Sequence, residues 1–326
     1  QGACAGGDSI KKMEWSDVSS ILAEGGTVIG TARSADFRTY EGRHRAAANL
    51  LEHGIDHLVV IGGDGSLSGT NEFRGEWAQH VAELAAEGVI SPETAAEHPA
   101  LIIVGLVGSI DNDLVGTDMT IGADTALHRI LDAIDQLTST AASHQRTFVV
   151  EVMGRHCGYL PLMAAVAGGA DYVFTPEDPA GPGWQDDLAE HLRVGREAGR
   201  RESIVLVAEG AHDRDGNELS TQLIADTIQE RTGEDARVTI LGHVQRGGTP
   251  SAYDRWMSTL LGYAAVQEIL ASSAEDEPVI LGVRRNRITR IPLMKAVHDT
   301  RAVKDLIVAG DYAAAQASRG SSFSSM

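Results

Sequence analysis

The fold of this protein is decided by one stretch of sequence, Leu101-Ile-Ile-Val-Gly-Leu-Val-Gly-Ser-Ile-Asp-Asn-Asp113. Its apolar start predicts a buried strand, and its glycines end that strand before Ser109, Asp111 and Asp113. Ligands of open α/β sheets bind at the carboxyl ends of the strands. Asp111 can accept a proton there, Ser109 can hydrogen-bond, and Asp113 can orient a neighbour or hold a metal. Taken alone, the segment is explained more simply as a loop with an aspartate helix cap.

A second strand end carries a different chemistry. The apolar run His57 to Ile61 is followed by Gly62-Gly-Asp-Gly-Ser66. Successive glycines let backbone N–H groups approach a phosphate closely. Asp64 can carry Mg²⁺, which favours one or two carboxylates together with phosphate oxygens. The two strand ends together favour a site with a phosphate cradle, a metal ligand and a base.

Composition narrows the class of protein. The 326 residues allow one large or two medium domains. The net charge of −19 argues against binding to nucleic acid or to an anionic membrane. No segment resembles a signal peptide or a membrane span, so we expect a cytoplasmic protein. None of the lysines lies near the glycine-rich loops, which excludes a Walker-type lysine; the lysines are Lys11, Lys12, Lys295 and Lys304.

Apolar runs alternate with helical segments along the whole chain. Continuous apolar strands between helices predict parallel sheets that are covered on both faces. The expected fold class is therefore α/β, with two doubly wound domains. The Ser/Gly-rich tail from Ser318 is expected to be disordered or to start a linker. The predicted strands are 26–30, 57–61, 101–104, 147–152, 172–174, 203–208, 237–241 and 278–283.

Charged residues collect at the ends of these strands. A surface charge is the simpler explanation for any single arginine, but many of these charges abut buried strands. One metal carboxylate, one base, several arginines and a histidine suit phosphoryl transfer to a phosphorylated hydroxyl compound. The residues at the carboxyl ends are Arg33, Asp64, Asp111, Arg155, Glu209, His243 and Arg246, and those that open strands are Arg146 and Arg237.

Six segments, in order, resemble motifs of the 6-phosphofructokinase family. They are Gly62-Gly-Asp-Gly-Ser66, Gly108-Ser-Ile-Asp-Asn-Asp113, Ser143-His-Gln-Arg146, Glu151-Val-Met-Gly-Arg155, Ala208-Glu-Gly210 and Leu241-Gly-His-Val-Gln-Arg-Gly-Gly248. The residues of these segments are most similar to the catalytic half of the eukaryotic-type, ATP-dependent enzymes, which contain two homologous halves. The given sequence has no segment that resembles the family's first strand and its glycine-rich loop. Without that segment we expect an unpaired strand edge, aggregation and slow turnover.

The resemblance implies a role for each site residue. It implies ATP as co-substrate, Mg²⁺ on Asp64, and Asp111 as the base on the sugar 1-hydroxyl. Ser109 would lie beside the transferring phosphoryl group, and Arg155 would stabilise its charge. The ATP contacts implied are Arg33, Ser34, Gly63, Asp64, Gly65 and Ser66. The fructose 6-phosphate contacts implied are Ser109, Ile110, Asp111, Arg146, Met153, Gly154, Arg155, Glu209, Arg237, His243, Val244, Gln245 and Arg246.

The resemblance also implies an organisation. Residues 1–122 and 251–297 would form a nucleotide-binding domain, facing a sugar-phosphate domain of residues 123–250 and 298–326 across a cleft. The family implies an allosteric, glycolytic kinase that works as a homotetramer. Arg146 and Arg237 would serve the neighbouring subunit, and Glu177 and Arg201 lie where effector contacts are expected.

Two alternatives stay open. Pyrophosphate-dependent relatives place an aspartate at the position of Gly65 and a lysine at that of Gly108, and the glycines here favour ATP. A non-catalytic subunit or an inactive N-terminally truncated fragment is the other alternative. A non-catalytic subunit would be expected to lose its metal carboxylate or base, but Asp64, Asp111 and Arg155 are all present.

Overall fold

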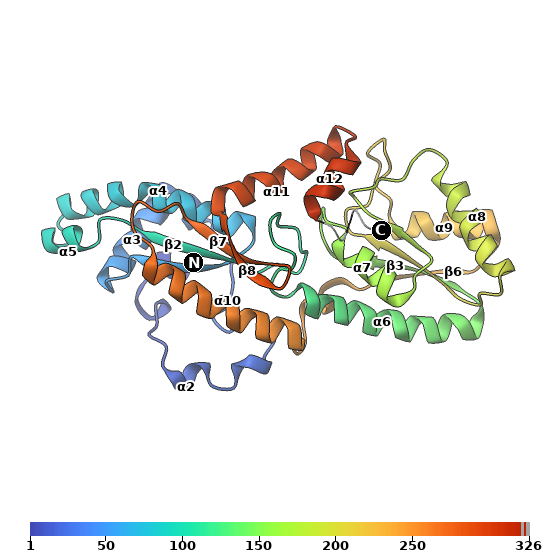
Figure 1. Ribbon diagram of the computed structural model, residues 1–326, viewed down its shortest axis with the longest axis horizontal. Helices are drawn as coiled ribbons and strands as arrows, with labels where there is room; N and C mark the ends of the chain where they lie inside the picture. The colour runs from blue at the N-terminus through green and yellow to red at the C-terminus, as the bar shows by residue number, and fades with distance from the viewer. Residues whose placement is uncertain (321–322, 324–326) are drawn as a thin grey trace. The chain divides into compact units, whose positions relative to one another are not determined.

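The computed structural model describes residues 1–320 and 323, and its fold is α/β with largely parallel sheets, as predicted (Figure 1). The chain forms two compact units. The first unit comprises Gln1–Gly108 and Arg255–His298, and the second comprises Ser109–Asp254 and Asp299–Met326. Each unit contains one four-stranded sheet.

The sheet of the first unit has the strand order β1-β2-β7-β8. The first three strands are parallel, with Val59 opposite Val104 and Val104 opposite Val279. Strand β8 runs antiparallel to β7, and the turn between them has positive φ at Arg285 and Asn286. A two-residue turn of this kind matches the twist of a hairpin. The strands are β1 His57–Gly62, β2 Ile102–Val107, β7 Val279–Arg284 and β8 Arg287–Pro292.

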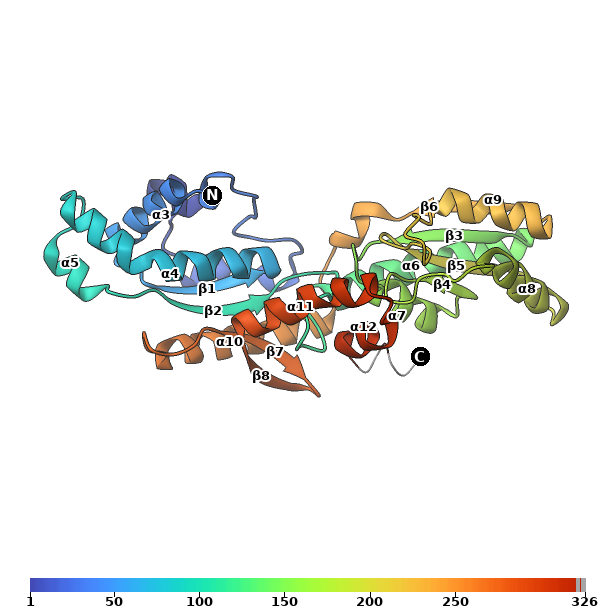
Figure 2. The ribbon, with the colours of Figure 1, turned by 90° about the horizontal axis from the view of Figure 1, so that it is seen from above.

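Helix α4 (Asp64–Ala86) lies along β1 and β2 and packs on them through a fully buried row that includes Leu67, Phe73 and Trp77 (Figure 2). Among the described residues, no helix is both long enough and apolar enough to cross a bilayer. The other helices that lie wholly or largely in this unit are α1 Gly2–Ala5, α2 Trp15–Val18, α3 Tyr40–Glu52, α5 Pro92–Glu97 and α10 Ala252–Ala271.

The predicted strand at 26–30 is wrong. The segment forms a turn, in which Gly30 N donates to Thr27 O, and Val28 and Ile29 are exposed. A strand needs a neighbour for its backbone groups, and residues 26–30 pair with no strand in the part of the chain that the structure describes. Apolar, β-branched residues are therefore not sufficient by themselves to form a strand at residues 26–30.

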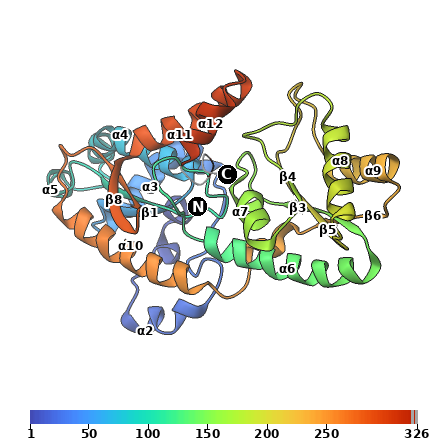
Figure 3. The same ribbon diagram turned by 45° about the vertical axis from the view of Figure 1, so that its right-hand side comes forward.

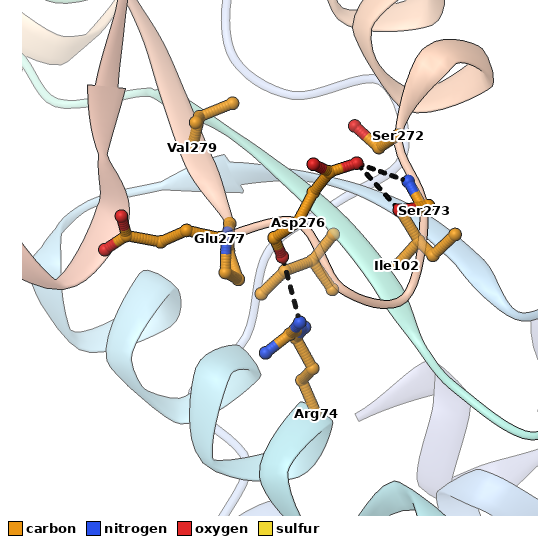
Figure 4. A pocket seen from close by; sticks show the side chains of 9 residues that line it. Arg74, Ile102, Ser272, Ser273, Asp276, Glu277 and Val279 are labelled. Carbon is orange, nitrogen blue, oxygen red and sulfur yellow. Dashed lines mark hydrogen bonds between the residues drawn. The ribbon is translucent and has the colours of Figure 1, made fainter.

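The loop between α10 and β7 is fastened to α4 by Arg74 (Figure 4). Arg74 Nη2 donates to the carbonyl oxygens of Ala274 at 3.3 Å and Asp276 at 3.1 Å. The Asp276 carboxylate in turn accepts a hydrogen bond from Ser273 N at 2.8 Å. The small pocket beside Arg74 is lined by none of the predicted site residues.

The sheet of the second unit has the order β4-β5-β3-β6, and all its strands are parallel. Alternate residues of β5 face opposite ways: Val205 packs under α8 and α9, and Leu206 under α6 and α7 (Figure 3). The strands are β3 Thr147–Val152, β4 Tyr172–Phe174, β5 Ser203–Ala208 and β6 Ala236–Ile240. The helices are α6 Ala123–His144, α7 Tyr159–Gly168, α8 Trp184–Glu197 and α9 Thr221–Thr232, together with α12 Tyr312–Arg319. Helix α11, Leu293–Val308, contributes residues to both units.

The two units meet in the sequence at positions that differ from the expected boundaries at 122 and 251. Residues 109–122 belong with the second unit. Thr120 Oγ1 donates to Ser109 O at 2.5 Å, and Gly122 N donates to Asp254 Oδ1 at 2.9 Å. These bonds hold the Asp111 loop against the start of α6.

The tail is more ordered than predicted. Ser318 and Arg319 belong to α12, and Phe323 is buried against Tyr159. Residues 321, 322 and 324–326 lie outside the described residues. The expectation of disorder from Ser318 is therefore wrong for these three residues, because the tail supplies Phe323 to the core and Arg319 to a buried ion pair.

Candidate active site

Asp111 lies in the loop after β2 and is only 5% exposed. Its backbone N donates to Ser109 Oγ at 3.3 Å, and Ser109 Oγ donates to Asp113 at 3.2 Å. Asp111 Oδ2 lies 3.6 Å from Arg155 Nε. Its Oδ1 is buried and has no hydrogen-bond partner among the described residues. An unpaired carboxylate oxygen in a buried position costs free energy, and such atoms are commonly reserved for function.

The electrostatic surroundings of Asp111 are mixed. Burial is the largest cause that raises the pKa of Asp111, and the negative charge of Asp113 is the next. The positive charges of Arg155 and Arg246 lower this pKa, and the result is a pKa of about 6. A carboxyl group with this pKa is mostly ionised at neutral pH and is a stronger base than an ordinary aspartate. Asp111 is therefore equipped to accept a proton.

Arg155 follows β3 in a turn whose backbone is tightly constrained. Gly154 has φ 146°, and a Cβ there would lie 2.3 Å from Cys157 O, so only glycine fits. Arg155 itself has φ 53°, and its N–H donates to Glu209 Oε2 at 3.1 Å. The backbone is thus held while the guanidinium stays about half exposed beside Asp111.

A short helical turn, Gly242–Arg246, is joined to the same strand end. Met153 N donates to the side-chain oxygen of Gln245 at 3.2 Å, and Gln245 Nε2 donates to Gly242 O at 3.0 Å. Gln245 is buried and links the two loops, whereas Val244 is 70% exposed. This link places Met153, Gly154, Arg155, Glu209, His243 and Arg246 at one end of the sheet.

Arg146 and Arg237 lie at the opposite end of this sheet. Both pair with Asp235, at 2.9 Å and 2.8 Å. Arg146 precedes β3 and Met153 follows it, and a strand of six residues spans about 20 Å. One chain therefore does not bring these two arginines to Arg155.

The glycine-rich loop of the first unit leads directly into α4. Gly63 is the N-cap and Asp64 the first helical residue, so the loop ends at a helix N-terminus, whose dipole attracts an anion. A Cβ added at Gly63 or Gly65 would meet nothing within 4 Å. Open space, helix N–H groups and a carboxylate fit the phosphates of a nucleotide with Mg²⁺ on Asp64.

Arg33 and Ser34 belong to the same unit, in the segment before α3. Ser34 Oγ accepts a hydrogen bond from Phe37 N at 3.2 Å, and Arg33 is exposed. Their predicted contact with ATP remains a prediction.

The model of the Phosphofructokinase family matches residues 1–269. The chain belongs to the phosphofructokinase family. The human protein named "ATP-dependent 6-phosphofructokinase, liver type" is 50% identical over 99% of this chain and 41% of its own length. The Caenorhabditis elegans "ATP-dependent 6-phosphofructokinase 1" is also 50% identical, over 99% of this chain and 40% of its own length. The chain thus spans about two fifths of these relatives.

Solved structures agree with this membership. The phosphofructokinase of Saccharomyces cerevisiae superposes with a TM-score of 0.97 at 50% identity, over 99% of this chain and 43% of that chain. The pyrophosphate-dependent phosphofructokinase of Marinobacter aquaeolei shares only the fold, with a TM-score of 0.68 at 19% identity over 87% of this chain and 69% of its own.

Sequence reasoning missed one pair of residues that supports this site. Arg319 Nε lies 3.0 Å from Glu177 Oε1, and the Arg319 guanidinium also donates to the carbonyl oxygens of Asp113 and His156. No local signal marks Arg319, because it lies in a Ser/Gly-rich tail far from its partners. Glu177, expected to contact an effector, is fully buried in this pair.

Proposed function

We propose that the chain carries ATP-dependent 6-phosphofructokinase activity, the transfer of a phosphoryl group from ATP to the 1-hydroxyl of fructose 6-phosphate. One observation carries the proposal: the buried Asp111 lies beside Arg155 and keeps one carboxylate oxygen that has no hydrogen-bond partner among the described residues. A base and a guanidinium at one point suit phosphoryl transfer to a hydroxyl group.

In the proposed reaction, Asp111 Oδ1 takes the proton of the sugar hydroxyl. The raised pKa of Asp111 makes the carboxylate more basic, and the Ser109 hydroxyl holds its backbone in place. Arg155 balances the negative charge on the transferring group. The Glu209 carboxylate fixes the Arg155 backbone, which orients the guanidinium without neutralising it.

The nucleotide is proposed to bind the first unit. The N-terminus of α4 would receive its phosphates, and Asp64 would hold the Mg²⁺ that screens their charge. Arg33 and Ser34 would add contacts. Gly65 and Gly108 favour ATP over pyrophosphate, and the relatives at 50% identity are named ATP-dependent enzymes.

The sugar phosphate is proposed to bind the second unit. His243 and Arg246 would hold the 6-phosphate from the same chain, with Arg146 and Arg237 supplied by a neighbouring copy. The position of these two arginines at the far end of the sheet supports such sharing. We accordingly propose a homo-oligomer, a tetramer by family likeness, that is allosteric and acts in cytoplasmic glycolysis.

A coupled assay on the full chain tests the donor. ATP with Mg²⁺ should support the formation of fructose 1,6-bisphosphate, and pyrophosphate with Mg²⁺ should not. Preferential turnover with pyrophosphate would overturn the donor assignment, and turnover with neither donor would overturn the proposed activity.

A further inference from the structure

Helices α3 and α4 of the first unit bring three potential metal ligands together. His44 Nδ1 lies 3.1 Å from His80 Nδ1 and 3.6 Å from Glu83 Oε2. The three donor atoms all lie within 4.8 Å of one another. His44 comes from α3, and His80 and Glu83 come from α4, so the cluster joins the two helices.

The other nitrogen of each imidazole faces a carboxylate. His80 Nε2 lies 3.4 Å from Glu76 Oε2, and His44 Nε2 lies 3.6 Å from Glu87 Oε2. Negative charge on this side favours the proton on Nε2 of both rings. In that tautomer the two Nδ1 lone pairs face each other at 3.1 Å, and a cation between them would be bound by both. Carboxylates on the far nitrogen are also the usual companions of metal-binding histidines.

The distances suit a single ion. With bonds of about 2.05 Å, donor atoms 3.1 Å and 3.6 Å apart subtend angles of about 100° and 120° at the metal, close to tetrahedral. Tyr40 donates its hydroxyl to Glu83 Oε2 at 2.8 Å and so orients that carboxylate. Two imidazoles and one carboxylate are a ligand set that suits Zn²⁺ and similar ions more than Mg²⁺.

Burial and charge also favour an ion. His80 is fully buried, so an ion bound to its Nδ1 would be shielded from water on that side. Glu83 is 39% exposed, so an ion can enter from solvent on that side. Arg43, which precedes His44 on α3, is already held by Glu76 at 2.6 Å and Glu72 at 3.0 Å.

We propose that His44 Nδ1, His80 Nδ1 and Glu83 Oε2 form a binding site for a divalent transition-metal ion such as Zn²⁺, with water in the remaining position. The site clamps α3 to α4 and stabilises the first unit. This proposal does not depend on the proposed phosphofructokinase activity.

Calorimetry of the full chain with ZnCl₂, after treatment with a chelator, tests the proposal. The wild type should bind one Zn²⁺ per chain, and its melting temperature should rise with the ion because the ion binds the folded state. Co²⁺ should give the visible absorption of a tetrahedral site. His44→Gln should weaken Zn²⁺ binding about tenfold or more. His53→Gln is the matched control, because His53 is an exposed histidine at the end of the same helix.

His44 is mostly buried but not in the core, so His44→Gln is expected to fold, and circular dichroism checks this. Glu83→Gln provides a second variant on the exposed side of the cluster and should also weaken binding. No stoichiometric Zn²⁺ binding by the wild type would overturn the proposal, leaving a hydrogen bond between the two Nδ1 atoms. Equal affinity in the wild type and both variants would also overturn it.

Discussion

Glu177 and Arg319 form an ion pair with a separation of 3.0 Å, and their side chains are 0% and 6% exposed. The second oxygen of Glu177 accepts a hydrogen bond from Gly158 N at 2.9 Å. Arg319 donates to carbonyl groups of the loops that carry Asp111 and Arg155. This buried ion pair joins Arg319, near the end of the chain, to Glu177, and Arg319 thereby supports both loops of the candidate site.

Removing one partner of this pair should be costly. Arg319→Ala leaves the Glu177 carboxylate buried without its cation, and such changes destabilise by about 3–5 kcal/mol. Burial already raises the pKa of Glu177, and loss of Arg319 should raise it further, so the variant should lose stability as pH rises through that pKa. Urea denaturation at pH 5 and pH 8 measures this.

The matched control is Arg193→Ala, because Arg193 pairs with Glu190 and Glu197 on the surface. That variant should leave the free energy of unfolding nearly unchanged, because exposed ion pairs contribute little to stability. The double variant Arg319→Ala/Glu177→Gln should recover part of the lost stability. Equal stability of the Arg319 and Arg193 variants would show that the buried pair contributes little.

Asp111→Asn should remove the proposed base. We expect kcat to fall by about 10²–10⁴, with fructose 6-phosphate still bound. In the wild type, kcat/KM should rise with pH through an ionisation near the Asp111 pKa of about 6. Steady-state kinetics from pH 5 to pH 9 test both points. Near-normal turnover of the variant would exclude Asp111 as the base.

The same substitution should stabilise the fold at neutral pH. Asp111 has a folded pKa of about 6, above the ordinary 3.8, so the folded state binds the proton more tightly than the unfolded state. The wild type should therefore lose up to about 3 kcal/mol as pH rises from 4 to 7. Asp111→Asn lacks this loss. A difference in the free energy of unfolding between the two proteins that stays constant from pH 4 to pH 7 would contradict the expectation.

Arg155→Ala should depress kcat more than it weakens ATP binding. A guanidinium on the transferring phosphoryl group is worth about 10³-fold or more in rate. Calorimetry with ATP and kinetics with saturating substrates separate the two effects. A loss confined to ATP affinity would assign Arg155 to ground-state binding.

Arg237 should act on the site of a neighbouring copy. Arg237→Ala and Asp111→Asn should each be inactive alone, and a mixture of the two, reassociated after dissociation, should regain part of the activity. Arg246→Ala mixed with Asp111→Asn is the matched control and should regain none at shared sites, because the charge of Arg246 acts on Asp111 of its own chain. An active monomer in sedimentation would rule out sharing.

The sequence predicts the two sheets well, because most strands are continuous apolar runs between helices. The sequence-based prediction fails where a strand forms only if a neighbouring strand pairs with it. Val28 and Ile29 have the composition of a strand but find no partner among the described strands, and the Arg285-Asn286 turn forms without the usual glycine. Strand formation depends on a neighbour as much as on propensity.

The residue types at the strand ends are determined by the sequence alone. The glycines of the Gly62–Ser66 loop, Asp111 after β2 and Arg155 after β3 are each recognisable locally, because turn chemistry and strand position are properties of short segments. The pKa of Asp111 and the position of Arg146 at the far end of its sheet are not local properties. They depend on burial and on strand direction.

Only the tertiary structure brings Arg319 to Glu177 and His44 to His80. The members of these pairs are separated by 142 and 36 residues. No periodicity links residues so far apart, and each contact exists only after a helix has packed against its neighbour. These contacts contribute to the stability of the fold because the groups are buried. A charge or a lone pair that is removed from water costs free energy unless it has a partner inside the protein.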